Sequence, residues 1–279
     1  MQGQFFSEQN RYEIVHLLGK GATGEVYLVR EYNSMQIYAM KICEDRELLR
    51  QESELLQKLK HPMFPAWKDY FEEKQGYLIM EYIEGITLQK YMEGTGKMVL
   101  TLAQKIILDI LGVLDFLHHQ IPQIIYRDLK PENIMISSTG KIKLIDLGGA
   151  IDSKYKVGTY GYGAPEQFWE GTIPGPECDL YAAGKLLAFL LTGKDPCQPP
   201  YDMLRFCEKN KFISPEIYRV LQRSLAVESL GRYASAGEFI RDIQEAVRIS
   251  QSKKWKKSSQ KQQNVYEKCI WKSEYQRIF

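Results

Sequence analysis

The chain has few of the features that mark a disulfide framework, a zinc site or a membrane span. Its five cysteines are an odd number, lie far apart and form no C-x-x-C pair, so we expect reduced thiols. No apolar run is long enough to cross a bilayer. The first ten residues also lack the basic flank and apolar core of a signal peptide. These absences predict a cytoplasmic protein, or the cytoplasmic portion of a larger one.

Neither sign of charge is in large excess. The 279 residues carry 37 Lys and Arg against 35 Asp and Glu, a net charge of +2. No overall field marks a nucleic-acid binder, and we predict no nucleic-acid partner. Hydrophobic residues make up 44% and charged residues 26%, which excludes a mainly disordered, collagen-like or coiled-coil chain. A chain of this length can bury a sizeable core in about two domains.

The residue pattern changes along the chain from strands to helices. Alternating apolar residues predict strands at 12–17, 25–30, 36–42 and 77–82. Apolar residues at helical spacing predict helices at 45–60, 101–118, 179–192 and 234–250. We therefore predict an α+β protein with a small β-rich lobe over residues 1–83 and a larger, mostly helical lobe over 84–250.

Residues 251–279 differ in composition and form a third region. They contain eight Lys or Arg and two Asp or Glu, a local net charge of +6, with several tryptophans and tyrosines among them. Such a basic aromatic tail could bind an anionic membrane surface or an acidic partner. The alternative is a solvated tail that packs its aromatic residues on its own domain, and the sequence favours this second interpretation by about two to one.

A glycine-rich stretch indicates a phosphate-binding hairpin. Residues 19–26, Gly-Lys-Gly-Ala-Thr-Gly-Glu-Val, follow the pattern G-x-G-x-x-G-x-V. Glycines let a backbone approach phosphate oxygens closely, because no Cβ intervenes. A dinucleotide fold would place a helix directly afterwards, yet a strand follows here. The G-x-x-x-x-G-K-[ST] motif of P-loop enzymes is missing as well. The stretch is therefore expected to form a β-hairpin lid over phosphates.

A lysine inside an apolar strand predicts an ion pair. Lys41 stands in the sequence Ala-Met-Lys-Ile, and desolvating an unpaired ammonium costs several kcal/mol. The following helix offers Glu47, Glu52 and Glu54, of which we select Glu52 as the partner. A lone strand lysine is more often a surface residue with a snorkelling head. Its place after the glycine-rich stretch instead favours a phosphate-binding role.

Three further motifs carry a family resemblance. Residues 126–133 read Tyr-Arg-Asp-Leu-Lys-Pro-Glu-Asn, residues 146–148 read Asp-Leu-Gly, and residues 164–166 read Ala-Pro-Glu. With the glycine-rich stretch and Lys41, the chain resembles a eukaryotic-type (Hanks-type) Ser/Thr protein kinase over residues 12–248. The stretches 158–167 and 232–236 are similar to bacterial members. The resemblance implies the bilobal protein kinase fold.

The resemblance implies a role for each polar group of the reaction. Asp128 is expected to accept the proton of the substrate hydroxyl or to orient that hydroxyl. Lys130 is expected to contact the γ-phosphate, and in the family a lysine at this position is associated with Ser/Thr specificity. Asn133 and Asp146 are the expected ligands of Mg²⁺, with Mn²⁺ as the alternative metal. Lys41 is expected to hold the α- and β-phosphates of ATP, and Glu52 to hold Lys41.

The resemblance also implies where the nucleotide lies. Met80 corresponds to the gatekeeper, the backbone of 81–83 to the hinge that binds adenine, and Glu84 to a ribose contact. Val26, Ala39 and Met135 would sandwich the ring. The expected nucleotide-binding residues are Leu18, Gly19, Lys20, Gly21, Ala22, Thr23, Gly24, Glu25, Val26, Ala39, Lys41, Glu52, Met80, Glu81, Ile83, Glu84 and Met135.

The expected function is transfer of the γ-phosphate of ATP to Ser or Thr hydroxyls of proteins, including the enzyme itself. Tyr126 and Leu147 replace the usual His and Phe at packing positions, which removes no chemistry. The segment from Asp146 to Glu166 is short, with Ser153 and Tyr155 as its only hydroxyls before Thr159. We hypothesise that it is ordered without phosphorylation or by a partner. A nucleotide-binding pseudokinase and a small-molecule kinase are the alternatives, both disfavoured by the motifs present. Dimerisation is left open.

Overall fold

The computed structural model describes residues 5–6, 11–21, 23–151, 158–199 and 202–252. The chain folds as two compact units. Unit 1 comprises Met1–Lys90 and Pro131–Val157, and unit 2 comprises Tyr91–Lys130 and Gly158–Phe279. The sequence analysis placed all of 84–250 in one lobe, whereas residues 131–157 fold with the N-terminal residues. A strand at residues 134–137 pairs with a strand at residues 85–87, and a strand at residues 142–144 pairs with the strand at 134–137 in turn.

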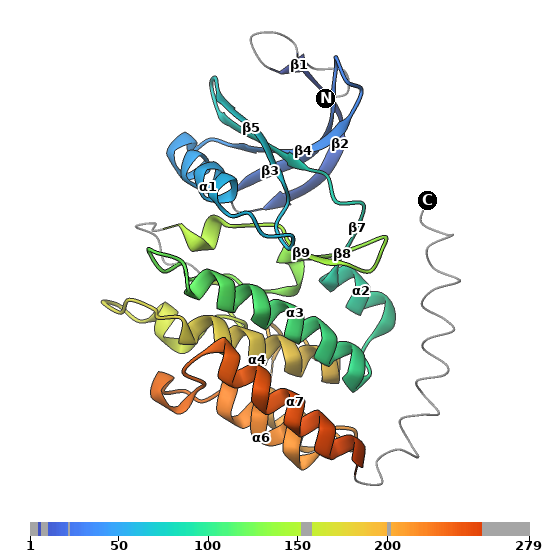
Figure 1. The fold of residues 1–279 in the computed structure, drawn as a ribbon, viewed down its shortest axis with the longest axis vertical. Coiled ribbons are helices and arrows are strands. Elements are labelled where there is room, and N and C mark those ends of the chain that lie inside the picture. Colours follow the sequence, from blue (N-terminus) through green and yellow to red (C-terminus); the bar gives the residue numbers. More distant parts are fainter. Residues whose placement is uncertain (1–4, 7–10, 22, 152–157, 200–201, 253–279) are drawn as a thin grey trace. The chain divides into compact units, whose positions relative to one another are not determined.

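Unit 1 is built on two antiparallel sheets (Figure 1). The larger has six strands in the order β1-β2-β3-β4-β6-β5 and the smaller has three in the order β7-β8-β9. The strands are β1 (Phe5–Phe6), β2 (Tyr12–Gly21), β3 (Gly24–Glu31), β4 (Ile37–Cys43), β5 (Trp67–Glu72), β6 (Gly76–Glu81), β7 (Gly85–Thr87), β8 (Ile134–Ser137) and β9 (Ile142–Leu144). Four of them match the predicted strands, and the remaining ones are too short or too little alternating to be recognised from the sequence.

Helix α1 (Arg46–Lys58) connects β4 to β5 and carries the predicted helix of this unit. Asp45 caps it, since its side chain accepts a hydrogen bond from the N–H of Leu48 at 3.0 Å. The helix buries Leu49 and Leu56, as their spacing predicts, and with them Glu52. It ends at Lys58, two residues before the predicted end.

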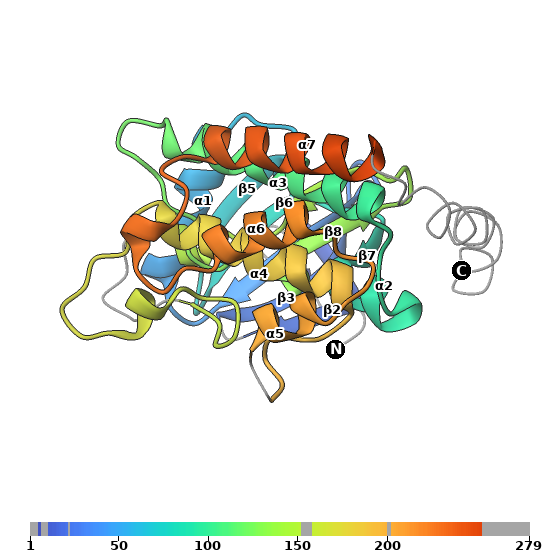
Figure 2. The same cartoon turned by 90° about the horizontal axis from the view of Figure 1, so that it is seen from below.

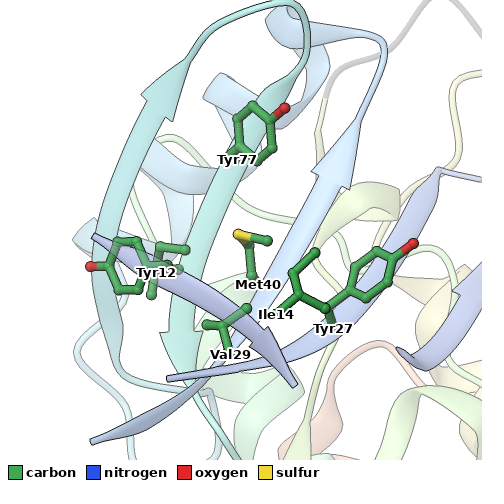
Figure 3. Close-up of a cluster of buried hydrophobic side chains, with 7 residues drawn as sticks. Tyr12, Ile14, Tyr27, Val29, Met40 and Tyr77 are labelled. Atoms are coloured by element: carbon green, nitrogen blue, oxygen red, sulfur yellow. The ribbon is translucent and has the colours of Figure 1, made fainter. Parts of the chain in front are cut away.

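One face of the larger sheet carries a cluster of aromatic and aliphatic side chains (Figure 3). Alternate residues of four strands supply it, as the two-residue period of a strand requires. Its buried members are Tyr12, Ile14, Tyr27, Val29, Met40, Tyr77 and Ile79. Lys41, the neighbour of Met40 in β4, belongs to the alternate set of side chains. The strand therefore places one side chain in this cluster and the next on the opposite face.

Unit 2 is helical (Figure 2). Its helices are α3 (Leu100–His118), α4 (Glu177–Thr192), α5 (Met203–Glu208), α6 (Pro215–Ser224) and α7 (Ala236–Ser252), and α2 (Leu88–Thr95) leads into it from unit 1. Helix α4 packs against α3 and α6, and α7 packs against α3 and α6 as well. All of α4 except Glu177, Lys185 and Thr192 is buried, which explains why its sequence is apolar on every side.

Short 3₁₀ turns complete the fold. They are η1 (Pro131–Asn133) and η2 (Gly148–Ala150) in unit 1, and η3 (Pro165–Phe168) and η4 (Ser229–Gly231) in unit 2. Among the described residues, none of the helices meets the length and hydropathy expected of a transmembrane segment. The predicted α+β fold class agrees with this arrangement of a sheet-rich and a helical part.

Candidate active site

The glycine-rich stretch forms the hairpin that the sequence predicts. β2 and β3 pair in antiparallel register down to Gly21 and Gly24. Gly24 has a φ of +140°, and a Cβ there would collide with the carbonyl of Ile42, so the position requires glycine. Lys20 and Glu25 face each other across the hairpin and form an ion pair at 2.8 Å. Leu18, Gly19, Thr23 and Val26 lie on this hairpin, while Ala22 lies outside the described residues.

The ion pair predicted for Lys41 is present and has a third member. The Nζ of Lys41 lies 2.9 and 2.7 Å from the two carboxylate oxygens of Glu52, and 3.2 Å from Oδ1 of Asp146. The side chains of Lys41 and Glu52 are only 6% and 5% exposed. Burial alone lowers the pKa of Lys41, but the two carboxylates outweigh it and raise that pKa above its ordinary value. Lys41 is therefore held as an ammonium.

Asn133 and Asp146 are brought together by strand pairing. Asn133 ends η1 and Asp146 follows β9, and the N–H of Ile145 donates to the carbonyl of Asn133 at 3.0 Å. Oδ1 of Asp146 also accepts from the N–H of Gly148 at 2.8 Å. One carboxylate and one amide fit Mg²⁺, which takes few protein oxygens and completes its shell with water and phosphate. No group of three or more metal-ligating His, Cys, Asp or Glu side chains occurs among the described residues.

The residues expected around adenine lie in unit 1, on strands of both sheets and in the segment between β6 and β7. Ala39 of β4 and Met80 of β6 are cross-strand partners, and both are buried. Ile83 is buried as well, and Met135 is half-buried in β8. The N–H of Glu81 already donates to the carbonyl of Ala66 at 2.8 Å, so hydrogen bonds to a base edge would use other backbone groups of 81–83. Glu84 is exposed.

Asp128 and Lys130 lie in unit 2, where Thr159 links them. The hydroxyl of Thr159 donates to Oδ1 of Asp128 at 2.7 Å, and the Nζ of Lys130 donates to the oxygen of Thr159 at 2.8 Å. Lys130 also lies 2.8 Å from Oδ2 of Asp128. The three side chains form a closed ring of contacts. It fixes the carboxylate and places a positive charge beside it.

Arg127, the neighbour of Asp128, has a strained backbone that two side chains hold. Its φ is +64°, a left-handed conformation that costs a non-glycine residue about 1–2 kcal/mol. Its N–H donates to the buried carboxylate of Asp179 at 2.7 Å, and its carbonyl accepts from the side chain of Gln167 at 2.8 Å. Asp179 also accepts from the N–H of Tyr126 and contacts the ring of His118, both at 2.8 Å.

The sequence analysis assigned no role to two of these supports, His118 and Gln167. His118 lies in the last turn of an apolar helix. Its side chain is only 8% exposed because it packs against residues distant in the sequence, such as Asp179. Only the segment 158–167 hinted at Gln167. Ser153, Tyr155 and residues 253–279 of the basic tail lie outside the described residues, and the predictions for them stay predictions. Residues 251 and 252, which the sequence analysis placed in the tail, form the end of α7 (Ala236–Ser252).

A second buried ion pair anchors the segment that ends at Glu166. The guanidinium of Arg232 donates to both carboxylate oxygens of Glu166, at 2.6 and 2.8 Å. It also donates to the carbonyls of Ala226 and Val227. This bidentate geometry is the strongest arrangement available to an arginine and a carboxylate.

Comparison with known proteins identifies the family. The family model described as "Protein kinase domain" matches residues 12–278. The chain belongs to this family. The resemblance drawn from the motifs is thereby confirmed, together with the kinase fold.

Curated relatives of the family include bacterial and fungal kinases. Serine/threonine-protein kinase C of Synechocystis sp. is 31% identical over 269 residues, covering 84% of this chain and 50% of that protein. Serine/threonine-protein kinase PknB of Mycobacterium leprae is 30% identical over 267 residues, covering 84% and 42%. An Aurora kinase of Saccharomyces cerevisiae is 36% identical over 200 residues, covering 66% and 54%. The chain spans about half the length of these relatives.

Proposed function

We propose that this protein is an ATP-dependent serine/threonine protein kinase. The observation that carries the proposal is the set Lys41, Glu52 and Asp146, in which the buried ammonium of Lys41 is held by two carboxylates. Family membership and the similarity to bacterial serine/threonine-protein kinases support the same activity. Lys130, beside Asp128, supports Ser/Thr rather than Tyr specificity through the family resemblance.

Unit 1 is proposed to bind the nucleotide. The hairpin of β2 and β3 would cover the phosphates with its glycine backbone, and Lys41 would donate to the α- and β-phosphates. Because Glu52 accepts two hydrogen bonds from Lys41, the ammonium is fixed before the nucleotide arrives. A fixed charge needs no reorganisation during the reaction, which is how preorganised groups stabilise a transition state.

Asn133 and Asp146 are proposed to hold Mg²⁺, with Mn²⁺ as the alternative. When bound, the ion neutralises charge on the phosphates. Gly148 keeps the Asp146 carboxylate in place by donating its N–H to Oδ1. Removing the carboxylate of Asp146 would therefore remove both an ion ligand and a partner of Lys41.

Asp128 is proposed to accept the proton of the substrate hydroxyl, or to orient that hydroxyl for in-line attack. Thr159 holds one of its oxygens and Lys130 contacts the other. Lys130 would also contact the γ-phosphate. The strained backbone at Arg127, tied down by Asp179 and Gln167, fixes the direction in which the next side chain points.

The substrate is proposed to be a protein with a Ser or Thr acceptor, and the enzyme itself is one candidate substrate. We also propose a cytoplasmic location, on the composition of the sequence. Contact of the basic tail with a membrane surface, and dimerisation, are further proposals that rest on the sequence alone.

The test is phosphate transfer from γ-labelled ATP with Mg²⁺ to a generic acceptor protein, with Lys41→Met and Asp128→Asn beside the wild type. We expect label on Ser or Thr in the wild type and a loss of at least about 10²-fold in each variant. ATP that raises the melting temperature of the wild type without any transfer would instead indicate a pseudokinase. Label on a small molecule but on no protein would indicate a small-molecule kinase.

A further inference from the structure

The residues that precede β5 join the two sheets of unit 1. The carbonyl of Met63 accepts from the N–H of Leu144 in β9 at 2.7 Å. Three residues later, the carbonyl of Ala66 accepts from the N–H of Glu81 at the end of β6 at 2.8 Å. Residues 63–66 therefore touch both β9 of the smaller sheet and β6 of the larger one.

A single ion pair closes this connection. The Nζ of Lys143 in β9 lies 2.6 Å from Oε2 of Glu81, and it also donates to the carbonyl of Phe64 at 3.2 Å. The same Oε2 accepts from the N–H of Ala66 at 2.9 Å. One carboxylate oxygen thus holds a lysine of one sheet and a backbone N–H of the joining segment. Glu81 itself is the last residue of β6, in the larger sheet.

The two strands that the pair connects lead into different parts of the proposed nucleotide site. Glu81 begins the segment 81–84, which we assign to the binding of adenine and ribose. The other end of this segment is held by a hydrogen bond from the N–H of Ser138 to the carbonyl of Glu84 at 2.8 Å. Lys143 lies three residues before Asp146, which contacts Lys41. A change at the pair would therefore move the base-binding segment relative to the phosphate-binding and metal-binding groups.

We infer that the Glu81–Lys143 pair is a clamp that positions the adenine-binding segment relative to Asp146, and that it sets the affinity for ATP. This inference rests on the proposed function. Glu81 and Lys143 act as positioning residues, since their charged groups are engaged with each other and with the segment 64–66.

The surroundings of the pair distinguish it from an ordinary surface ion pair. Most exposed pairs contribute little, because water screens them and two long side chains must be ordered. The side chain of Glu81 is 37% exposed, but that of Lys143 is only 16% exposed, and Lys143 has a backbone acceptor besides the carboxylate. Loss of Glu81 would leave this largely buried ammonium with the carbonyl of Phe64 as its one hydrogen-bond acceptor among the described residues, an arrangement that favours displacement of the strand.

Steady-state kinetics on Glu81→Gln, Lys143→Met and the double variant test the clamp. We expect the KM for ATP to rise about three- to tenfold in each single variant, which corresponds to loss of part of one charge-assisted hydrogen bond. The KM for the acceptor protein and kcat should change less than about twofold. The double variant should be no worse than the worse single variant, because both remove the same contact. Glu81→Ala, which also removes the acceptor for Ala66, should raise the KM further than Glu81→Gln.

A matched control is Glu245→Gln on α7, which breaks the exposed pair between Glu245 and Arg248 of that helix. This variant should leave kcat and both KM values unchanged. Variants that melt at a lower temperature yet keep the wild-type KM for ATP would overturn the inference, because the pair would then be only structural. A fall in that KM, or additive effects in the double variant, would also overturn it. Failure of the proposed function shows differently, as a wild-type protein that neither transfers phosphate nor gains melting temperature with ATP.

Discussion

Replacing Glu166 by glutamine should destabilise unit 2 strongly, because it breaks the buried pair with Arg232. The guanidinium is completely buried and donates to both oxygens of Glu166, whose side chain is 14% exposed. Glutamine keeps one acceptor oxygen but turns an N–H₂ group toward one of the guanidinium N–H groups. Removing one partner of a buried ion pair costs about 3–5 kcal/mol.

The local contacts place the effect at the lower end of this range. Arg232 keeps the carbonyls of Ala226 and Val227, at 2.8 and 2.7 Å, and stays over the ring of Tyr181. We therefore expect a loss of about 3 kcal/mol, or a fall of about 6–12 °C in the melting temperature for a unit of this size.

Thermal unfolding followed by far-ultraviolet circular dichroism measures this fall. The control is Glu245→Gln, which removes an exposed carboxylate from its pair with Arg248 and should shift the melting temperature by less than about 2 °C. Arg232→Met should restore part of the stability when combined with Glu166→Gln, since it removes the unpaired charge. If Glu166→Gln melts within about 2 °C of the wild type, the reasoning about the buried pair is refuted.

Three further predictions concern a turn, the thiols and pH. Gly24→Ala should weaken ATP binding, measured by calorimetry, because its Cβ would collide with the carbonyl of Ile42; unchanged affinity would contradict this. Burial raises the pKa of Cys207 to about 12, so at pH 8 iodoacetamide should label half-exposed Cys197 well before Cys207, and mass spectrometry reads the order. Burial lowers the pKa of His61 below 6.5, so the unfolded chain takes up the proton first as pH falls. The stability from neutral His61 is therefore present above about pH 6.5 and lost below it; His61→Gln should reduce the difference in melting temperature between pH 7.5 and 5.5, and an unaltered difference would speak against it.

The parts of the site that depend on local pattern could be predicted from the sequence. The hairpin at Gly21 and Gly24 follows from glycine spacing and alternation. The partner of Lys41 follows from one strand and one helix, since burying a lysine demands a carboxylate and the apolar face of α1 limits which glutamate can reach it. The structure bears out both of these expectations.

The parts of the site that depend on packing between residues distant in the sequence could not be predicted. The assignment of residues 131–157 to unit 1 arises from pairing of strands as short as Ile142–Leu144, which carry almost no periodic signal. Lys143 and His118 act through residues more than fifty positions away along the chain. In the sequence, these two residues cannot be distinguished from an ordinary surface lysine and an ordinary histidine at a helix end, because their partners become neighbours only in the folded chain. The roles assigned to Asp128 and Asn133 still rest on the family resemblance.

The measurement that tests the central claim most directly is mass-spectrometric mapping of phosphate transferred from γ-¹⁸O-labelled ATP, in the wild type and in Asp128→Asn at equal protein concentration. The account predicts isotope-labelled phosphate on Ser or Thr residues of the acceptor protein in the wild-type reaction only. Labelled phosphate at the same residues and the same rate in Asp128→Asn, or its complete absence from the wild-type reaction while ATP remains bound, would contradict it.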